Sequence, residues 1–382
     1  MTEWKRVFEK SMVIPPHTQM VRLAQDRSEG FQIVLKHLEG TPHRQKLLDG
    51  LQAVQYQLRL SLFDISYKHF FGRTWKSSVQ QLRVTPGQPG RVSFNEVLYF
   101  HTSLRHPNIM AVVEVVAVAQ NARGSQHALG CGFGILRLFS NHTEPDDPSA
   151  EKQDKRLNLF HGTPRALLHP ALHHPIEQNK HVTRIEGAHI QYTLQPHPAL
   201  ETVMHLLPQD MVVSGAEEIP GVVPSSDVSG DSLRKPRLLK TFTCSLDKLS
   251  LHLYPSLEAF EEEMLQLLNT DRLNRDNSGP DGHTVLIQER RLHVGVHNGW
   301  GFVVKPQVVV VEPEPEGIKG RSGSFSRRPG SLTRLSSSGR HTLVLRSRLQ
   351  LRDMVNHPAF GIVFHLEYVF SAPVGGGGGK VN

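Results

Sequence analysis

Histidine is the residue with the widest chemical scope in this sequence, with 23 among 382 residues. Five of them lie close together: His161, His169, His173, His174 and His181. His169 and His173 have the spacing that places two zinc ligands on one face of a helix. However, Pro170 and Pro175 would interrupt such a helix, and no cysteine or nearby aspartate completes a tetrahedral set. We therefore expect no metal site.

His-Pro pairs recur along the chain and have a simpler explanation than metal binding. They begin at His106, His169, His174, His197 and His357. Proline biases the residue before it toward extended backbone and is common in turns. We therefore interpret these pairs as turns at the ends of strands.

Residues 130–134 (GCGFG) have the glycine content of a phosphate-binding loop. The dinucleotide-binding fingerprint needs a third glycine where Ile135 stands, and it precedes a helix, whereas a strand-like apolar run follows here. We therefore predict a bulged strand. No Walker lysine, nucleophile elbow, zinc-protease motif or kinase catalytic loop occurs in the sequence, so we expect no catalytic residues, no cofactor and no enzyme activity.

Residues 69–76 (HFFGRTWK) combine aromatic and cationic side chains directly after a predicted strand. This segment is the candidate interaction loop, and its candidate residues are Phe70, Phe71, Arg73, Trp75 and Lys76. Such a loop could insert into a groove of a partner protein or into a lipid headgroup layer. The alternative is that Phe70 and Trp75 cap the hydrophobic core, and the sequence leaves both open.

A serine- and arginine-rich stretch follows the acidic residues 312–316. Residues 317–341 contain six Lys and Arg and no acid, and residues 312–341 are predicted to form a disordered basic loop. Ser331 and Ser336 follow arginines at a spacing that basophilic kinases prefer, so they are candidate phosphorylation sites. Because these six charges supply most of the net charge of +7, the folded parts are close to neutral and we expect no nucleic-acid partner.

The elements that position these residues are predicted to be mainly β-strands. Apolar and polar residues alternate in many segments between residues 31 and 195, for example in residues 56–62 (YQLRLSL). Residues 111–118 are almost all apolar, which is typical of a central strand covered on both faces. This pattern favours an antiparallel β-sandwich.

The second half is predicted to be another β-rich unit with one amphipathic helix at residues 255–269. The apolar stripe of this helix consists of Leu257, Phe260, Met264, Leu267 and Leu268. We expect a first domain over residues 1–207 with an N-terminal extension, a linker over 208–237, a second domain over 238–372, and a flexible glycine-rich tail over 373–382. With two cysteines and no secretory or membrane-spanning segment, the chain is expected to be cytoplasmic.

Residues 94–100, a strand ending at residue 115, and residues 130–138 together resemble the middle of a C2-type β-sandwich. Many C2 domains bind calcium between loops at one end with several carboxylates. The matching loops here offer Asp64 alone, and no acid occurs in residues 119–128. Calcium binding is therefore not expected.

A second resemblance covers nearly the whole chain. It rests on residues 69–76 (HFFGRTWK), 94–104 (FNEVLYFHTSL), 131–138 (CGFGILRL), 161–170 (HGTPRALLHP), 254–257 with 260–262, 290–298 (RRLHVGVHN) and 366–371 (LEYVFS). These segments, in this order, resemble the N-terminal part of the nephrocystin-4 family. Members of that family are longer, so we expect this chain to correspond to the opening section of a longer scaffold, either as a fragment or as a short form.

The resemblance implies a non-enzymatic scaffold or adaptor at the transition zone and basal body of the primary cilium. It also implies links to cell junctions and the actin cytoskeleton, a role in Hippo signalling, and partnership with nephrocystin-1 and the retinitis-pigmentosa-regulator-interacting proteins. The alternative function is a calcium-independent peripheral membrane module, not integral to the bilayer, in which Arg73 and Lys76 contact anionic lipid.

Overall fold

The computed structural model describes residues 12–40, 52–84, 86–87, 89–120, 126–139, 154–172, 175, 179–226, 230–276, 285–314 and 342–371. The chain divides into two compact units. The first comprises residues 1–239 together with residues 298–301, and the second comprises residues 240–297 and 302–382. The named strands pair antiparallel in both units, so the prediction of a mainly antiparallel β fold is confirmed.

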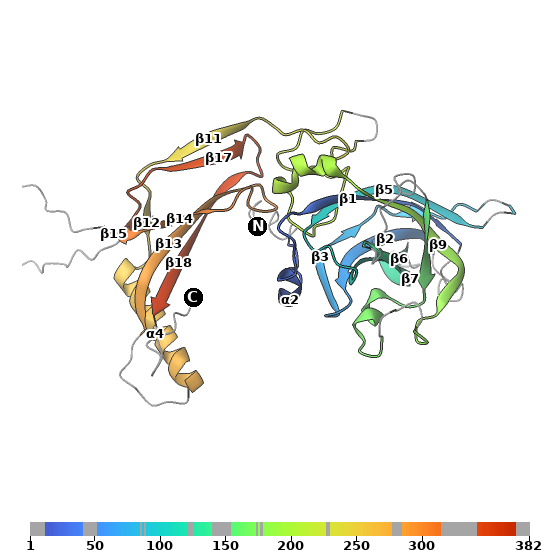
Figure 1. Ribbon diagram of the computed structural model, residues 1–382, viewed down its shortest axis with the longest axis horizontal. Coiled ribbons are helices and arrows are strands. Elements are labelled where there is room, and N and C mark those ends of the chain that lie inside the picture. The colour runs from blue at the N-terminus through green and yellow to red at the C-terminus, as the bar shows by residue number, and fades with distance from the viewer. Residues whose placement is uncertain are drawn as a thin grey trace, which may run out of the picture. The chain divides into compact units, whose positions relative to one another are not determined.

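The first unit is built on a 10-stranded sheet with the order β10-β5-β1-β9-β8-β7-β6-β2-β3, in which β4 pairs with β2. Its strands are β1 (Glu29–Glu39), β2 (Gln52–Asp64), β3 (His69–Lys76), β4 (Gln80–Gln81), β5 (Arg91–Thr102), β6 (Ile109–Gln120), β7 (Gln126–Arg137), β8 (Lys155–Phe160), β9 (Arg184–Pro196) and β10 (Val213–Ser214). Short helices occur at α2 (Thr18–Val21), η2 (Pro164–Leu168), η4 (Pro198–Thr202) and η5 (Met204–Leu206). Figure 1 shows the strands curving around a common interior.

Strand β6 lies between β7 and β2 in the interior of this sheet and is buried on both faces. Ala111, Val113 and Val115 belong to the main core, which also contains residues of β1, β2, β5 and β9. Met110 and Val112 point to the opposite face, into a second cluster that also contains residues of β7 and η2. The prediction of a central strand covered on both sides is therefore confirmed.

The glycine-rich segment of β7 contains the predicted bulge. Val115 of β6 pairs with Gly132 and the next residue, Val116, pairs with Gly130, so Cys131 is the extra residue. A Cβ atom at Gly134 would lie 2.6 Å from Leu157 Cγ. The glycines thus allow β7 and β8 to approach closely, and no helix follows them.

The His-Pro pairs form turns in which the histidine ring takes part. The Nδ1 atoms of His106, His169 and His357 accept hydrogen bonds from the backbone N–H two residues later, at 3.1–3.2 Å. The carbonyls of these residues and of His197 accept a bond from the N–H three residues later. The turn interpretation is confirmed for these four pairs, while His174 lies outside the described residues.

The second unit contains three small sheets and one long helix. Its strands are β11 (Thr241–Leu246), β12 (Ser250–His252), β13 (Leu286–His297), β14 (Gln307–Val310), β15 (Glu312–Pro313), β16 (Thr342–Val344), β17 (Leu349–Val355) and β18 (Gly361–Ser371). They pair as β11-β17, β12-β16-β15 and β14-β13-β18. Helix α4 (Leu257–Asp276) runs along the β13–β18 pair (Figure 1).

Helix α4 begins where Ser256 provides an N-cap, with its Oγ accepting a bond from Ala259 N at 3.1 Å. Leu257 is 2% exposed, whereas Leu267 is 66% exposed. The predicted apolar stripe is therefore wrong at Leu267. A polar contact lies on the buried face instead, because Glu261 receives two bonds from the Arg290 guanidinium at 2.6 and 2.7 Å and one from the Tyr368 hydroxyl at 3.1 Å.

Residues 208–237, which the sequence indicated as a linker, belong to the first unit. Apolar side chains of this segment are buried: Met211, Val212, Val213, Ile219, Val222 and Leu233. Of the predicted basic loop, Glu312 and Pro313 form β15, and residues 315–341, with Ser331 and Ser336, lie outside the described residues. The glycine-rich tail at 373–382 also lies outside them. Among the described residues, no helix is both long and apolar enough to cross a membrane.

The different burial of two leucines of α4 leads to a prediction. Leu257→Ala should destabilise the second unit by about 2–3 kcal/mol, because it removes a buried side chain. Leu267→Ala should change stability by less than about 0.5 kcal/mol, because this side chain is already in water. Amide hydrogen exchange of peptides from β13 and β18, measured by mass spectrometry in the full chain, distinguishes the variants. Equal effects would contradict the packing of α4.

Candidate functional site

The candidate interaction segment at residues 69–76 is strand β3, at one end of the sheet, and not a loop. Phe71 and Trp75 are 2% and 5% exposed and belong to the main core, and Phe70 packs against the second cluster. Lys76 is exposed. The aromatic residues therefore face the core, as in the alternative that the sequence left open.

Arg73 is held by groups of the first unit. Its Nη2 atom donates to Glu217 Oε1 at 2.9 Å, to Glu217 Oε2 at 2.8 Å and to the Val212 carbonyl at 3.0 Å. Its guanidinium carbon lies 5.6 Å from the centre of the Trp300 ring, and the side chain is 19% exposed. This cation thus fastens residues 212–217 to β3, and its charge is neutralised internally.

Trp300 is placed by an Asn-Gly turn that the sequence analysis did not single out. Asn298 is fully buried, and its Oδ1 accepts bonds from Trp300 N at 3.0 Å and Gly301 N at 2.9 Å. Its Nδ2 donates to the Leu206 carbonyl at 2.7 Å. The Asn-Gly dipeptide is a strong turn signal, but nothing in the sequence shows that this turn belongs to the first unit.

Asp210 is a buried acid next to β3. It is 4% exposed, and its Oδ1 atom has no hydrogen-bond partner. Burial raises the pKa of this carboxyl to about 6, although a bond from the Thr102 hydroxyl lowers it somewhat. A Cβ atom at Gly72 would lie 2.1 Å from the Asp210 carbonyl oxygen, which explains the glycine in β3.

Asp64, the residue at the calcium-loop position of the C2 resemblance, has a structural role. Its Oδ1 accepts bonds from Ser66 N at 2.9 Å and Tyr67 N at 3.3 Å, which holds the turn between β2 and β3. Within the described ranges, no group of three or more His, Cys, Asp and Glu side chains could hold a metal ion. Of the histidine cluster, His173 and His174 lie outside those ranges, and His161 and His181 are exposed.

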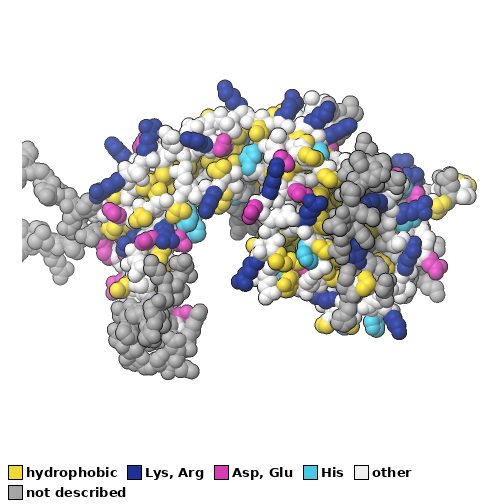
Figure 2. Space-filling view, in the orientation of Figure 1, with side chains coloured by type: hydrophobic (Ala, Val, Ile, Leu, Met, Phe, Trp, Pro, Cys, Tyr) yellow, Lys and Arg dark blue, Asp and Glu magenta, His cyan; other side chains and the backbone are white. Residues whose placement is uncertain are grey.

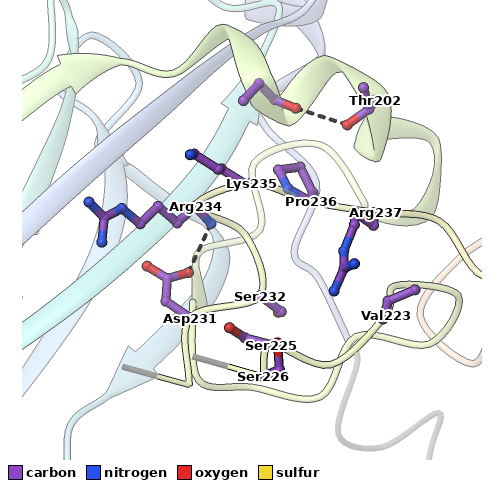
Figure 3. A pocket seen from close by; sticks show the side chains of 11 residues that line it. Thr202, Val223, Ser225, Ser226, Asp231, Ser232, Arg234, Lys235, Pro236 and Arg237 are labelled. Atoms are coloured by element: carbon purple, nitrogen blue, oxygen red, sulfur yellow. Dashed lines mark hydrogen bonds between the residues drawn. The ribbon is translucent and has the colours of Figure 1, made fainter. Parts of the chain in front are cut away.

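A more distinctive polar site lies in the segment that the sequence indicated as a linker. Residues 231–237, here called the cationic turn, carry Arg234, Lys235 and Arg237, and all three side chains are exposed. Two cavities of about 690 and 740 Å³ flank the turn and share Asp231, Arg234 and Lys235 as lining residues. Figure 3 shows the first cavity, in which Ser225, Ser226 and Arg237 also lie.

The cationic turn is fixed to the sheet by buried groups. Asp231 Oδ1 accepts bonds from Leu233 N at 3.0 Å and Arg234 N at 3.1 Å, while its Oδ2 accepts the Tyr99 hydroxyl at 2.7 Å. His197 Nε2 donates to the Leu233 carbonyl at 2.9 Å. Burial and the bond to Asp231 raise the pKa of the Tyr99 hydroxyl, so it remains a donor at neutral pH. The turn therefore presents its cations from a rigid base.

Arg73 and Lys76 should differ in how much each side chain contributes to the stability of the first unit. Arg73→Ala should lower the free energy of unfolding of the first unit by about 1.5–3 kcal/mol, because Glu217 and the Val212 carbonyl lose a charged donor. Lys76→Ala, the matched control in the same strand, should change it by less than about 0.5 kcal/mol. Chemical unfolding followed by tryptophan fluorescence reports both changes. Similar effects for the two variants would contradict the internal role of Arg73.

Asp210 predicts a pH dependence of stability. Its pKa is about 6 in the folded unit against 3.8 ordinarily, so its favourable contribution is complete below about pH 4 and is lost as the pH rises through 6. Asp210→Asn should therefore stabilise the chain by about 1–3 kcal/mol at pH 7.5, with the gain disappearing toward pH 4. His101, whose pKa is lowered by burial, acts in the opposite direction and cancels in this comparison. Unfolding curves across this range test it, and a pH-independent difference would contradict it.

Comparisons with known proteins complete this picture. A family model described as "Nephrocystin-4 second C2-like domain" matches residues 242–382. Human nephrocystin-4 is 55% identical to this chain over 376 residues, and nephrocystin-4 of Xenopus laevis is 51% identical over 375 residues. Each alignment covers 98% of this chain and 26% of the relative.

Among solved structures, a C2 domain of plant extended synaptotagmin 1 matches with 14% identity and a TM-score of 0.23, covering 44% of this chain and 95% of that domain. The fold class expected from the sequence, mainly β with C2-like architecture, is confirmed by the sheet topology and the family model. The chain is therefore a homologue of nephrocystin-4 over an N-terminal portion that spans about a quarter of the length of these relatives.

Proposed function

We propose that this chain is a non-enzymatic scaffold or adaptor of the primary-cilium transition zone and basal body. It acts in ciliary organisation and signalling, including regulation of the Hippo pathway, through contacts with other proteins. The observation that carries the proposal is the 55% identity to human nephrocystin-4 over 98% of the chain. At this level of identity over nearly all residues, the two β-rich units share their fold with that relative.

The chemistry of the described residues supports a role without catalysis. Three of the buried polar side chains have structural roles: Asp64 holds a turn, Asn298 holds a turn, and His101 Nε2 donates to the Leu207 carbonyl at 2.8 Å. Tyr99 and Asp231 serve to anchor the cationic turn. Hydrogen-bond networks of this kind fix surfaces, which is what a scaffold needs.

The partners proposed for the scaffold are nephrocystin-1 and the retinitis-pigmentosa-regulator-interacting proteins, with cell junctions and the cytoskeleton as further locations. Since the chain spans 26% of its relatives, each of these assignments is a proposal for this portion. Lys and Arg side chains lie scattered among acidic ones on the visible face of the described residues, apart from local groups (Figure 2). Such a mixed surface favours specific protein contacts over general attraction to polyanions.

The alternative of a membrane module based on β3 is weakened by the burial of its residues. Of Arg73, Trp75 and Lys76, only Lys76 presents an unengaged charge to solvent in the described structure. Insertion of a headgroup-binding segment requires exposed aromatic and cationic side chains together. We therefore propose protein binding as the function and treat lipid binding as an outcome to be tested below.

The proposal predicts where the chain resides in cells. Expressed with a small tag in ciliated epithelial cells, the full chain should concentrate at the ciliary base, and proximity labelling from it should enrich transition-zone proteins. A matched control is Val113→Asp, which places a charge in the centre of the core and should abolish the fold and the enrichment. A diffuse distribution of the folded wild-type chain, with no enrichment over the tag alone, would contradict the proposal.

A further inference from the structure

We infer that the cationic turn binds a phosphorylated segment, carrying phosphoserine or phosphothreonine, of a partner protein. This inference rests on the proposed scaffold function and names the chemistry of one partner site. It does not involve Arg73 of β3, which is already paired with Glu217. The site consists of Arg234, Lys235 and Arg237 with the first cavity, shown in Figure 3.

The cationic turn carries positive charge without internal compensation. Three cations occur within four consecutive residues, and no carboxylate in the described part of the chain lies within ion-pair distance of any of them. Asp231 is the sole acidic residue among the described residues that line the first cavity. Both of its oxygens are occupied by Leu233 N, Arg234 N and the Tyr99 hydroxyl, so it is committed to holding the turn.

Internal contacts hold the backbone of the cationic turn before any ligand binds. Leu233 is fully buried, its carbonyl is bound by His197, and Ser232 N donates to the Gly215 carbonyl at 3.0 Å. On a flexible segment, cations would move apart because like charges repel. Here the backbone is held in one geometry despite the repulsion between the three cations. Because the backbone is already ordered, only the cationic side chains lose freedom on binding, which lowers the entropic cost of holding a compact anion.

The ligand that suits the cationic turn is a phosphate rather than a carboxylate. A phosphate ester carries a charge near −2 and three acceptor oxygens. Figure 3 shows Arg237 on the side of the turn with Ser225 and Ser226, and Arg234 and Lys235 pointing to the other side. Arg237 can therefore bind the phosphate oxygens in a bidentate manner, while Arg234 and Lys235 add positive potential. The Ser226 side chain, which lines the same cavity, adds a hydroxyl. A single carboxylate would leave most of the positive charge unbalanced.

The residues that line the two cavities favour a peptide over a membrane surface. Arg234 and Lys235 line both cavities, and Arg237 lines the first. Among the described lining residues there is no Phe, Tyr or Trp of the kind that anchors a protein in a headgroup layer. The second cavity is bordered by Asn95 and Gln195 from the sheet, which can hydrogen-bond to residues flanking the phosphate. Glu96 also lines that cavity, so the phosphate is assigned to the first.

The test uses the purified full chain and two degenerate peptide libraries, one centred on phosphoserine or phosphothreonine and the other on unmodified serine or threonine. The wild type should enrich phosphorylated peptides, with binding that weakens as salt is raised. The triple variant Arg234→Ala, Lys235→Ala, Arg237→Ala should bind the enriched peptides at least about tenfold more weakly, because it removes every charged donor of the site.

A matched control removes the same charge elsewhere in the first unit: Arg22→Ala, Arg83→Ala, Lys180→Ala, at three exposed positions. It should bind the peptides as the wild type does, and thermal melting should be unchanged in both triple variants. Equal recovery of both libraries, or equal binding by the two triple variants, would overturn the inference. A second experiment measures binding of the same proteins to vesicles of phosphatidylserine with phosphatidylinositol bisphosphate.

Binding to these vesicles that the first triple variant loses, without enrichment of phosphopeptides, would assign the site to lipid headgroups and overturn the peptide inference. Failure here is separable from failure of the proposed function. A chain that concentrates at the ciliary base but enriches no phosphopeptide retains the scaffold role and loses this site. A triple variant that still concentrates at the ciliary base but has lost its peptides supports both.

Discussion

The burial of β6 on both faces is the constraint on which the first unit depends. Residues 109–113 of this strand alternate between two different hydrophobic clusters, so a polar side chain at any of these positions would be costly. Glu114, which follows them, is half-buried and lies beside Arg59. The close approach of β7 and β8 depends on glycine, because a Cβ atom at Gly132 or Gly134 would collide with Phe160 O or with Leu157 of β8. The two ends of the sheet, β10 and β3, lie next to irregular segments.

Those irregular segments are held by polar side chains that bond to the backbone. Arg73 holds residues 212–217, Asn298 holds its own turn, and Asp231 with Tyr99 holds the cationic turn. Backbone groups outside helices and sheets still require partners when buried, and side chains are the available source. Hydrogen bonds between side chains and the backbone thus account for both cases. Arg73 is paired inside the structure, whereas Arg234, Lys235 and Arg237 are exposed on a turn that other side chains hold.

This distinction bears on function. A cation paired with an internal carboxylate is already neutralised, so its removal changes stability. An unpaired cation on a fixed turn instead contributes to the electrostatic potential that a partner meets. The proposed scaffold role needs surfaces of the second kind. In the first unit these lie on residues 231–237 and not on residues 69–76, although the latter have the more conspicuous aromatic and cationic composition.

Alternation and apolar runs determined the mainly β fold, the two-sided burial of β6 and a helix at residues 255–269, because these depend on local periodicity. In the structure this helix spans Leu257–Asp276. The glycines of residues 130–134 indicated the bulged strand. The His-Pro turns were predictable for the same reason. Tertiary structure alone decided that Trp75 faces the core, that Arg73 meets Glu217, that Leu267 lies in water and that residues 208–237 pack into the first unit. Each of these depends on residues distant in sequence, since the partner of a side chain is set by packing and not by its neighbours in the chain.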